Sequence, residues 1–201
     1  MILPGTGWWS RRRQEPAPAA RVRLLMARRP IEPRIDPNRG EPTARPGVEA
    51  DVFREALSRW ASTVTVVSVR DGDAVHATTV TSFFPVSADP PLVAVALGPG
   101  AQVLPWMDPG ATFVVSFLTE SQRGLASRFA DSFPVGPSPF PTDGAPVVKG
   151  AVAGLVCTVR EAHATAGGAR IVVGRVEDAQ VGEGNPLLYH ARSYRRMAPQ
   201  E

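Results

Sequence analysis

The chain has 201 residues, of which 43% are hydrophobic and 20% are charged. This length is enough for one domain of about 150 residues with a buried core, and the composition is ordinary for a globular protein. No apolar run approaches the roughly 18 residues that a membrane-spanning helix needs, which excludes that class of membrane protein. The single cysteine, Cys157, cannot form an intramolecular disulfide, so we expect a reducing, cytoplasmic setting.

The formal net charge is +3, and the basic residues are concentrated at the start of the chain. Residues 1–48 contain ten arginines and four acidic residues, whereas residues 49–201 contain twelve basic and fifteen acidic residues. A basic nucleic-acid-binding module is therefore an alternative that depends on residues 1–48 alone. Because the rest of the chain is acidic, we expect no nucleic-acid partner, and we expect no membrane partner.

Residues 1–48 are rich in Arg and Pro and show no sustained apolar periodicity. This composition predicts a disordered N-terminal arm, followed by one folded domain over residues 49–198. The pair Arg11-Arg12 resembles the start of a twin-arginine export signal, but the nearest apolar island, residues 24–27, is shorter than the roughly 7–15 residues that such a signal requires. The sequence therefore favours a solvated leader over an export signal.

The folded part begins with a predicted helix. Phe53, Ala56, Leu57 and Trp60 follow the i, i+3, i+4, i+7 spacing of one helix face. Asp51 precedes this run and is the predicted N-cap, because its carboxylate can accept hydrogen bonds from free backbone N–H groups of the first turn.

The most informative stretch of the sequence is residues 77–91. It begins with β-branched residues that predict a strand and then enters a polar turn around Ser82, Phe83 and Pro85. The Asp-Gly signal at residues 70–73 predicts a hairpin that joins this strand to an earlier one. Tight turns between successive strands indicate an antiparallel sheet.

The second half of the chain continues this pattern. Residues 119–122 form a capping-box signature that starts a helix reaching Ala130, with Leu125 and Phe129 on its apolar face. The proline-rich residues 131–150 are a long loop, which we expect to cover a site. Further strands are predicted at residues 63–69, 92–97, 111–118, 151–160 and 170–181, with residues 186–190 and 194–197 closing the sheet. About seven strands with a few short helices indicate an all-β fold, a closed barrel in which few strand edges remain free.

Nothing in the sequence indicates catalysis by the side chains alone. His76, His163 and His190 lack metal-ligand spacing, so we predict no metal site, and we predict no catalytic residue of the chain itself. The hydroxyl-rich end of the strand before Ser82 offers short donors suited to a flat cofactor ring or a phosphate. A threonine-rich strand that simply enters a turn is the alternative interpretation. Glycines at residues 98–101, after a strand, can let backbone N–H groups approach a phosphate.

Residues 77–91, together with residues 53–57, 64–67 and 186–190, resemble the flavin reductase-like family. The resemblance extends over roughly residues 51–197, and its elements occur in the family's order. It implies a Greek-key split β-barrel that binds FMN, with FAD as an alternative, and that uses NADH or NADPH as co-substrate. It also implies a homodimer that supplies reduced flavin to a separate monooxygenase.

The resemblance assigns candidate site residues by position. The residues assigned to the flavin ring are Thr79, Thr81, Ser82, Phe83 and Ser87. The residues assigned to the flavin phosphate are Gly98, Pro99, Ala101 and Gln102, with Phe129 nearby. The residues assigned to the nicotinamide side are Ala169, His190 and Tyr194. A core position for Phe129, and a purely structural role for His190 and Tyr194 at the end of the sheet, are the alternatives.

Two departures from the family pattern bear on activity. Ala169 stands where the family has a histidine associated with nicotinamide binding, and Ala101 replaces a usual serine in the phosphate loop. Flavin binding tolerates these changes more readily than nicotinamide binding does. The predicted function is therefore an NAD(P)H:flavin oxidoreductase, and the alternative is a flavin-binding split-barrel protein that has lost or repurposed the reductase activity.

Overall fold

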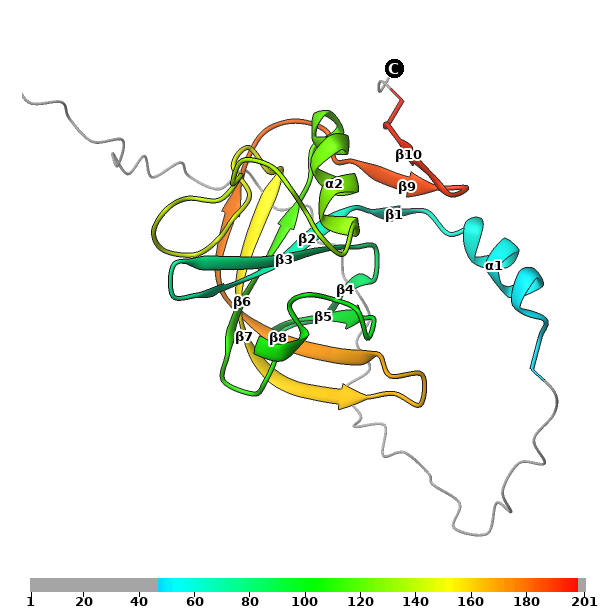
Figure 1. Cartoon of the computed structure of the whole chain (residues 1–201), viewed down its shortest axis with the longest axis horizontal. Helices are drawn as coiled ribbons and strands as arrows, with labels where there is room; N and C mark the ends of the chain where they lie inside the picture. Colours follow the sequence, from blue (N-terminus) through cyan, green and yellow to red (C-terminus); the bar gives the residue numbers. More distant parts are fainter. Residues whose placement is uncertain (1–46, 199–201) are drawn as a thin grey trace, which may run out of the picture. The chain divides into compact units, whose positions relative to one another are not determined.

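The computed structural model describes residues 47–198, so the predicted N-terminal arm lies outside the described residues except for Gly47 and Val48. Two helices, two short 3₁₀ helices and ten strands make up the described part (Figure 1). In chain order the elements are α1 (Ala50–Ser58), β1 (Ser62–Thr63), β2 (Thr65–Asp71), β3 (Ala74–Val80), β4 (Phe83–Ala88), β5 (Pro91–Leu97), η1 (Leu104–Trp106), β6 (Thr112–Phe117), η2 (Glu120–Gln122), α2 (Arg123–Ala130), β7 (Ala153–Ala164), β8 (Arg170–Val181), β9 (Leu188–His190) and β10 (Ser193–Arg195).

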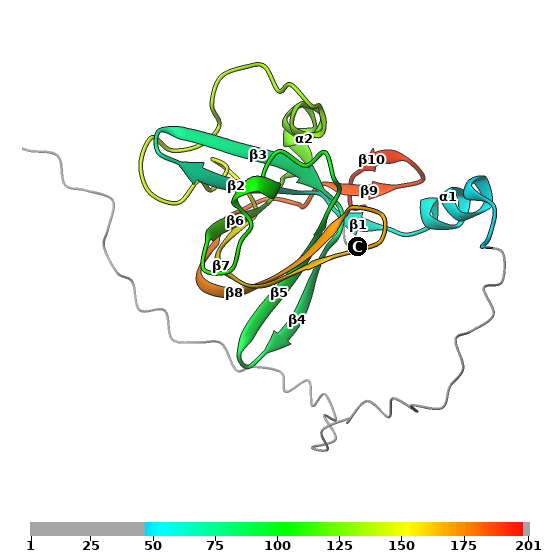
Figure 2. The ribbon, with the colours of Figure 1, turned by 60° about the horizontal axis from the view of Figure 1, so that its bottom comes forward.

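Seven strands form one antiparallel sheet in the order β3-β2-β6-β7-β8-β5-β4. The hairpins β2–β3, β4–β5 and β7–β8 are local, whereas the chain crosses between β5 and β6 from one side of β7–β8 to the other. Strands β3 and β4 are the two ends of this order, and only Thr81 and Ser82 separate them along the chain. In Figure 2 the far ends of β4 and β5 project from the rest of the sheet. The predicted all-β split barrel is confirmed.

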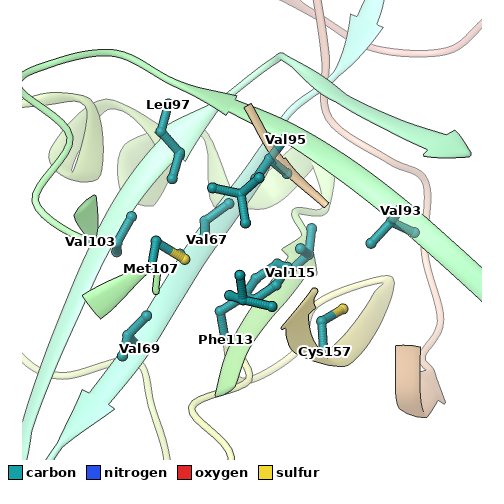
Figure 3. Close-up of a cluster of buried hydrophobic side chains, with 12 residues drawn as sticks. Val67, Val69, Val93, Val95, Leu97, Val103, Met107, Phe113, Val115 and Cys157 are labelled. Atoms are coloured by element: carbon teal, nitrogen blue, oxygen red, sulfur yellow. The ribbon is translucent and has the colours of Figure 1, made fainter. Parts of the chain in front are cut away.

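The barrel interior is filled by side chains from five strands and the segment around η1 (Figure 3). Strand alternation sends Val67 and Val69 of β2 into this core. The fully buried members of largest volume include Phe113, Leu97 and Met107. Because these buried side chains pack against one another and fill the interior, the barrel is a packed core, and a ligand must bind on its outside or at its rim.

The opposite face of β2 carries a second buried cluster. Val64 and Val66 point to this side, where Ala126 and Phe129 of α2 and Phe140 of the following loop cover them. The predicted capping box is present at the start of η2, directly before α2. The backbone N–H of Thr119 donates to the Oε1 of Gln122 at 3.0 Å. Helix α2 then ends at Ala130, as the sequence predicted.

Three local predictions were wrong. Glu49, with an extended backbone, is the N-cap of α1, and Asp51 lies inside the first turn, where its carboxylate pairs with Arg54. The predicted turn beyond Ser82 is strand β4, because Phe83 and its neighbours pair with β5. The C-terminal segments do not close the main sheet; β9 and β10 pair with β1 in a separate three-stranded sheet.

Candidate active site

The junction between β3 and β4 holds the central candidate residues. Thr81 is exposed, whereas Ser82 is half-buried and its hydroxyl donates to the carbonyl oxygen of Ala96 at 2.6 Å. The ring of Phe83 packs edge-on against Phe117 with centroids 4.9 Å apart, at the rim of the barrel core. Ser82 and Phe83 are thus fixed by β5 and the core, which leaves Thr81 as the hydroxyl free to meet a ligand.

The loop that follows β5 starts beside this junction. Gly98 lies two residues after Ala96, and a tight turn is closed by the backbone N–H of Ala101, which donates to the Gly98 carbonyl at 2.9 Å. Residues 98–100 are exposed, and a Cβ placed on Gly98 or Gly100 would meet no atom within 4 Å. The backbone here is therefore open to a ligand.

The tip of the β7–β8 hairpin reaches the same loop. Strand pairing sets Leu97 opposite Arg170, and a Cβ placed on Gly168 would lie 3.6 Å from the Cβ of Pro99. Ala169 therefore stands next to the loop that follows β5. The fold brings three candidate segments together, and we call them the β5-end site: residues 81–83, 98–102 and 168–170.

Two side chains fix the outer parts of the β5-end site. The amide of Gln102 donates to the carbonyl of Ser132, which brings the start of the long loop to the site. The guanidinium of Arg170 lies 3.5 Å from both the Leu104 carbonyl and the Asp108 carboxylate. No role was predicted for Arg170, although it is the cation adjacent to Ala169; its position beside the site follows only from its pairing with Leu97.

Two of the predicted ring contacts lie apart from these segments. The hydroxyl of Thr79 donates to the Ala126 carbonyl at 2.8 Å, so this side chain faces α2. Ser87 lies near the far end of β4, opposite Leu92. At about 3.3 Å per residue, that is roughly 13 Å along the strand from Phe83. The hydroxyl of Ser87 accepts a hydrogen bond from the Asp89 backbone at 3.2 Å.

Phe129 belongs to the second buried cluster and is only 6% exposed. Its ring lies 5.6 Å from that of Phe140, as the core alternative predicted. It also forms part of the wall of a pocket of about 610 Å³ between α2, the β2–β3 hairpin and the long loop. Arg70 and Arg128 line this pocket while donating to loop carbonyls, so the long loop forms one wall of an open pocket whose lining includes no residue of the β5-end site.

His190 and Tyr194 lie in the small sheet. The ring of Tyr194 packs against Tyr189 with centroids 5.6 Å apart, and the Arg123 guanidinium lies 5.5 Å from its centroid. Tyr194 and Arg123 also line a second pocket of about 200 Å³. His190 ends β9 and pairs with Ser193. These contacts are with the small sheet and the start of α2, and none is with the β5-end site.

Within residues 47–198, no group of three or more His, Cys, Asp or Glu side chains is arranged to hold a metal ion. None of the helices in that range is long and apolar enough to cross a membrane. The thiol of Cys157 is buried in the barrel core, and burial, with a smaller effect of the Glu177 charge, raises its pKa to about 12. Such a thiol is protonated at neutral pH and is not a nucleophile.

Comparison with known proteins places these features in context. A family model described as "Flavin reductase like domain" matches residues 57–198. The reductase component of 4-hydroxyphenylacetate 3-monooxygenase from Thermus thermophilus is 40% identical over 151 residues, which cover 73% of this chain and 96% of that protein. An NADH-dependent flavin reductase from Rhodococcus is 35% identical over 155 residues, which cover 72% of this chain and 85% of the relative.

Solved structures give the same result for the fold. The flavin reductase PheA2 superposes with a TM-score of 0.68 at 31% identity, covering 75% of this chain and 99% of that one. The NADH:FAD oxidoreductase SgcE6 of Streptomyces globisporus, in complex with NAD and FAD fragments, gives a TM-score of 0.65 at 30% identity, with coverages of 77% and 98%.

Proposed function

Because the chain belongs to the flavin reductase-like family, we propose that it is an NADH-dependent reductase of FMN that acts at the β5-end site. It is an oxidoreductase that reduces flavin with a nicotinamide nucleotide, as its relatives do. The observation that carries the proposal is the meeting of residues 81–83, 98–102 and 168–170 at one end of β5. These segments are far apart in sequence, and each was assigned to the flavin or nicotinamide side.

The residues at this end of β5 fit a flavin nucleotide. Thr81 is an exposed neutral hydroxyl that suits the polar edge of a flat ring, and residues 98–100 expose backbone beside it that suits a phosphate. Open space at Gly98 and Gly100 lets a phosphate approach the main chain closely. Ser82 and Gln102 hold the two segments in place through their own hydrogen bonds.

A bound flavin would supply the hydride acceptor for the nicotinamide nucleotide, and the reduced flavin, which carries both electrons, would then be the product that leaves. The contribution of the chain is to hold and orient both nucleotides, because orientation at near-contact distance supplies much of the rate acceleration. Residues 81–83 would hold the ring, and the hairpin tip at Ala169 would form the neighbouring wall. The packed core behind Phe83 excludes water from that side.

The finer assignments follow the relatives. Several are named NADH-dependent flavin or FMN reductases, which favours NADH over NADPH and FMN over FAD. Two relatives are named reductase components or subunits of monooxygenases, so we propose a separate monooxygenase as the partner. We further propose a homodimer, and a cytoplasmic location in which the single buried cysteine stays reduced.

A second candidate function is supported by one observation. Ala169 has no side chain able to donate a hydrogen bond, yet it occupies the hairpin position next to the loop after β5. A flavin-binding barrel that has lost or repurposed the reductase step would tolerate this residue. The two candidates share the flavin site and differ only in the nicotinamide reaction.

One titration separates the two candidates. Apoprotein is titrated with FMN and then with NADH under anaerobic conditions, while flavin absorbance is followed. The reductase predicts saturable FMN binding and bleaching of the flavin band by NADH. FMN binding without bleaching at millimolar NADH or NADPH would favour the repurposed barrel, and absence of FMN and FAD binding would contradict both.

A further inference from the structure

Arg170 is the only ionisable residue in the three segments of the β5-end site. Residues 81–83, 98–102 and 168–169 have neutral side chains or are glycines. A phosphate monoester bound there would carry roughly 1.5 to 2 negative charges at neutral pH. These segments therefore contain one cation that can balance the charge of a nucleotide, and they contain no carboxylate that would repel it.

Strand pairing places Arg170 beside the loop that follows β5. Its Cα is paired with that of Leu97, the last residue of β5, and paired Cα atoms in antiparallel strands are about 4.5–5.5 Å apart. Paired residues extend their side chains to the same side of the sheet. Because Leu97 is fully buried in the barrel core, the side chain of Arg170 leaves the sheet on that side, at the end of the strand.

The guanidinium of Arg170 is connected to the open backbone of this loop by successive polar contacts. Its Nη1 lies 3.5 Å from the carbonyl oxygen of Leu104. The backbone N–H of Leu104 donates to the carbonyl of Ala101 at 3.1 Å, and the N–H of Ala101 donates to the carbonyl of Gly98 at 2.9 Å. The positive charge therefore lies next to the turn that exposes residues 98–100.

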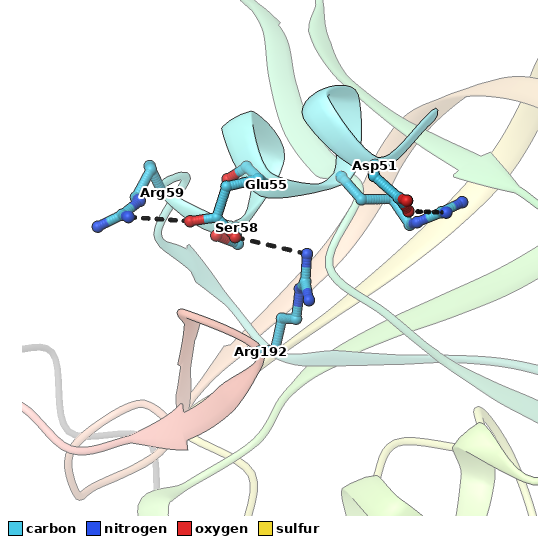
Figure 4. A network of polar contacts seen from close by, with 6 residues as sticks. Asp51, Glu55, Ser58, Arg59 and Arg192 are labelled. Atoms are coloured by element: carbon cyan, nitrogen blue, oxygen red, sulfur yellow. Dashed lines mark hydrogen bonds and ion pairs between the residues drawn. The ribbon is translucent and has the colours of Figure 1, made fainter. Parts of the chain in front are cut away.

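The contacts that Arg170 makes within the chain are long, and they involve one nitrogen. The same Nη1 lies 3.5 Å from the carboxylate of Asp108, which is 73% exposed. Charge-assisted hydrogen bonds are ordinarily about 2.7–2.9 Å long, as in the pair of Arg59 and Glu55 at 2.9 Å (Figure 4). The contacts of Arg170 leave its Nε and Nη2 unused, and these two donors form a planar fork that matches two phosphate oxygens.

We propose that Arg170 binds the phosphate group of FMN at the β5-end site. Its Nε and Nη2 donate to the phosphate oxygens, and the open backbone at residues 98–100 contacts the same group. The carboxylate of Asp108 competes for the guanidinium and repels the phosphate. The inference rests on the proposed function and deepens it, because it names the residue by which the site distinguishes a flavin nucleotide from a flavin without phosphate.

The test compares FMN with riboflavin, which has the same ring system and no phosphate. Arg170→Met removes the charge and keeps an unbranched side chain. It should raise the Kd for FMN about 5- to 30-fold, as expected for a charge-assisted hydrogen bond at a partly exposed position. The Kd for riboflavin should not change. Arg170→Lys retains the charge and should retain part of the FMN affinity. Both constants are measured by quenching of flavin fluorescence, and circular dichroism checks the fold.

Two further variants complete the test. Arg175→Met is the matched control, because Arg175 lies on the same strand and pairs with Leu92 at the other end of β5, roughly 17 Å from Arg170. The same loss of charge there should alter neither Kd. Asp108→Asn removes the competing carboxylate and should lower the Kd for FMN about two- to five-fold, with riboflavin unchanged. This variant tests the inference independently of the folding of Arg170→Met.

The outcomes separate this inference from the proposed function. Unchanged FMN binding in Arg170→Met, or an equal loss for FMN and riboflavin, overturns the inference. A rise in the Michaelis constant for NADH alone also overturns it, because Arg170 would then bind the nicotinamide nucleotide. Flavin binding is measured without NADH, so a protein that binds FMN through Arg170 but does not oxidise NADH contradicts the reductase reaction alone. Absence of binding of both flavins contradicts the flavin site and, with it, this inference.

Discussion

The hydroxyl of Thr79 on β3 donates a 2.8 Å hydrogen bond to the carbonyl oxygen of Ala126 in α2. This contact ties the helix to the strand that leads into the β5-end site. It also engages the hydroxyl hydrogen of Thr79, whereas Thr81, two residues on, is exposed at the junction with β4. Thr79 therefore stabilises the packing of α2 on β3, whereas Thr81 leaves its hydroxyl accessible at the β5-end site.

Substitution of these threonines should separate stability from flavin binding. Thr79→Val should lower the free energy of unfolding by about 1 kcal/mol, the usual net value of one hydrogen bond. This corresponds to a fall of roughly 2–4 °C in Tm for a domain of this size. Thr81→Val should leave Tm unchanged and weaken FMN binding, measured by fluorescence quenching. A Thr81→Val protein with unchanged flavin affinity would remove Thr81 from the site.

Ala169→His should strengthen binding of the nicotinamide nucleotide alone. One added hydrogen bond to a polar or charged group is worth about 0.5–3 kcal/mol, which is a fall in the Michaelis constant for NADH of about two-fold to more than a hundred-fold. The FMN dissociation constant should not change. Ala166→His, an exposed position in the same turn, is the control, and an equal effect there would assign the gain to charge near the hairpin.

Gly174→Ala should destabilise the barrel through overpacking. A Cβ at Gly174 would lie 2.5 Å from the Cζ of Phe113, which is fully buried in the core. The expected loss is about 1–3 kcal/mol in the free energy of unfolding, measured by urea denaturation. Gly167→Ala is the matched control, since a Cβ there meets no atom within 4 Å. Equal stability of the two variants would mean that the strand shifts to admit the methyl group.

The thiol of Cys157 should make the fold sensitive to alkali. Burial, followed by the Glu177 charge, raises its pKa from 9.0 to about 12. The fold favours the neutral thiol, so this stabilisation is complete below about pH 9 and is lost as pH rises from about 9 toward about 12. Cys157→Ala should show a smaller fall in unfolding free energy over that range. Iodoacetamide at about pH 8 should modify Cys157 only after unfolding; rapid labelling of the folded protein would contradict its burial.

The sequence predicted the local features of this fold well. The Asp-Gly turn after β2 has the left-handed glycine that a two-residue hairpin requires, at Gly72 with φ +56°. The capping box at Thr119 and the apolar periodicity of α2 were also correct. Each of these depends on residues within a few positions of one another, and such patterns are readable from one chain.

The failures involve partners that are distant in the sequence. Phe83 belongs to a strand because Val95 pairs with it, and polar neighbours with Pro85 concealed this. The short β9 lies in a separate sheet because Ser62 and Thr63 pair with it. At the site, resemblance supplied the segments, but only pairing of Leu97 with Arg170 indicated that Ala169 and Pro99 are neighbours. The resemblance also grouped Ser87 with Ser82, and the length of β4 separates them.

The pairing of β1 with β9 also sets an order of events during synthesis. Thr63 pairs with Leu188, and the Ser58 carbonyl accepts a hydrogen bond from the Ala191 N–H. The contacts that fix the end of α1 therefore form only when nearly the whole domain has left the ribosome. Contacts of such long sequence separation form late, because the chain between them must first be ordered. Helix α1 is among the first parts of the domain to emerge and among the last to be oriented. Its exposed apolar side chains, such as Phe53 and Leu57, therefore take their final direction only after the barrel has folded.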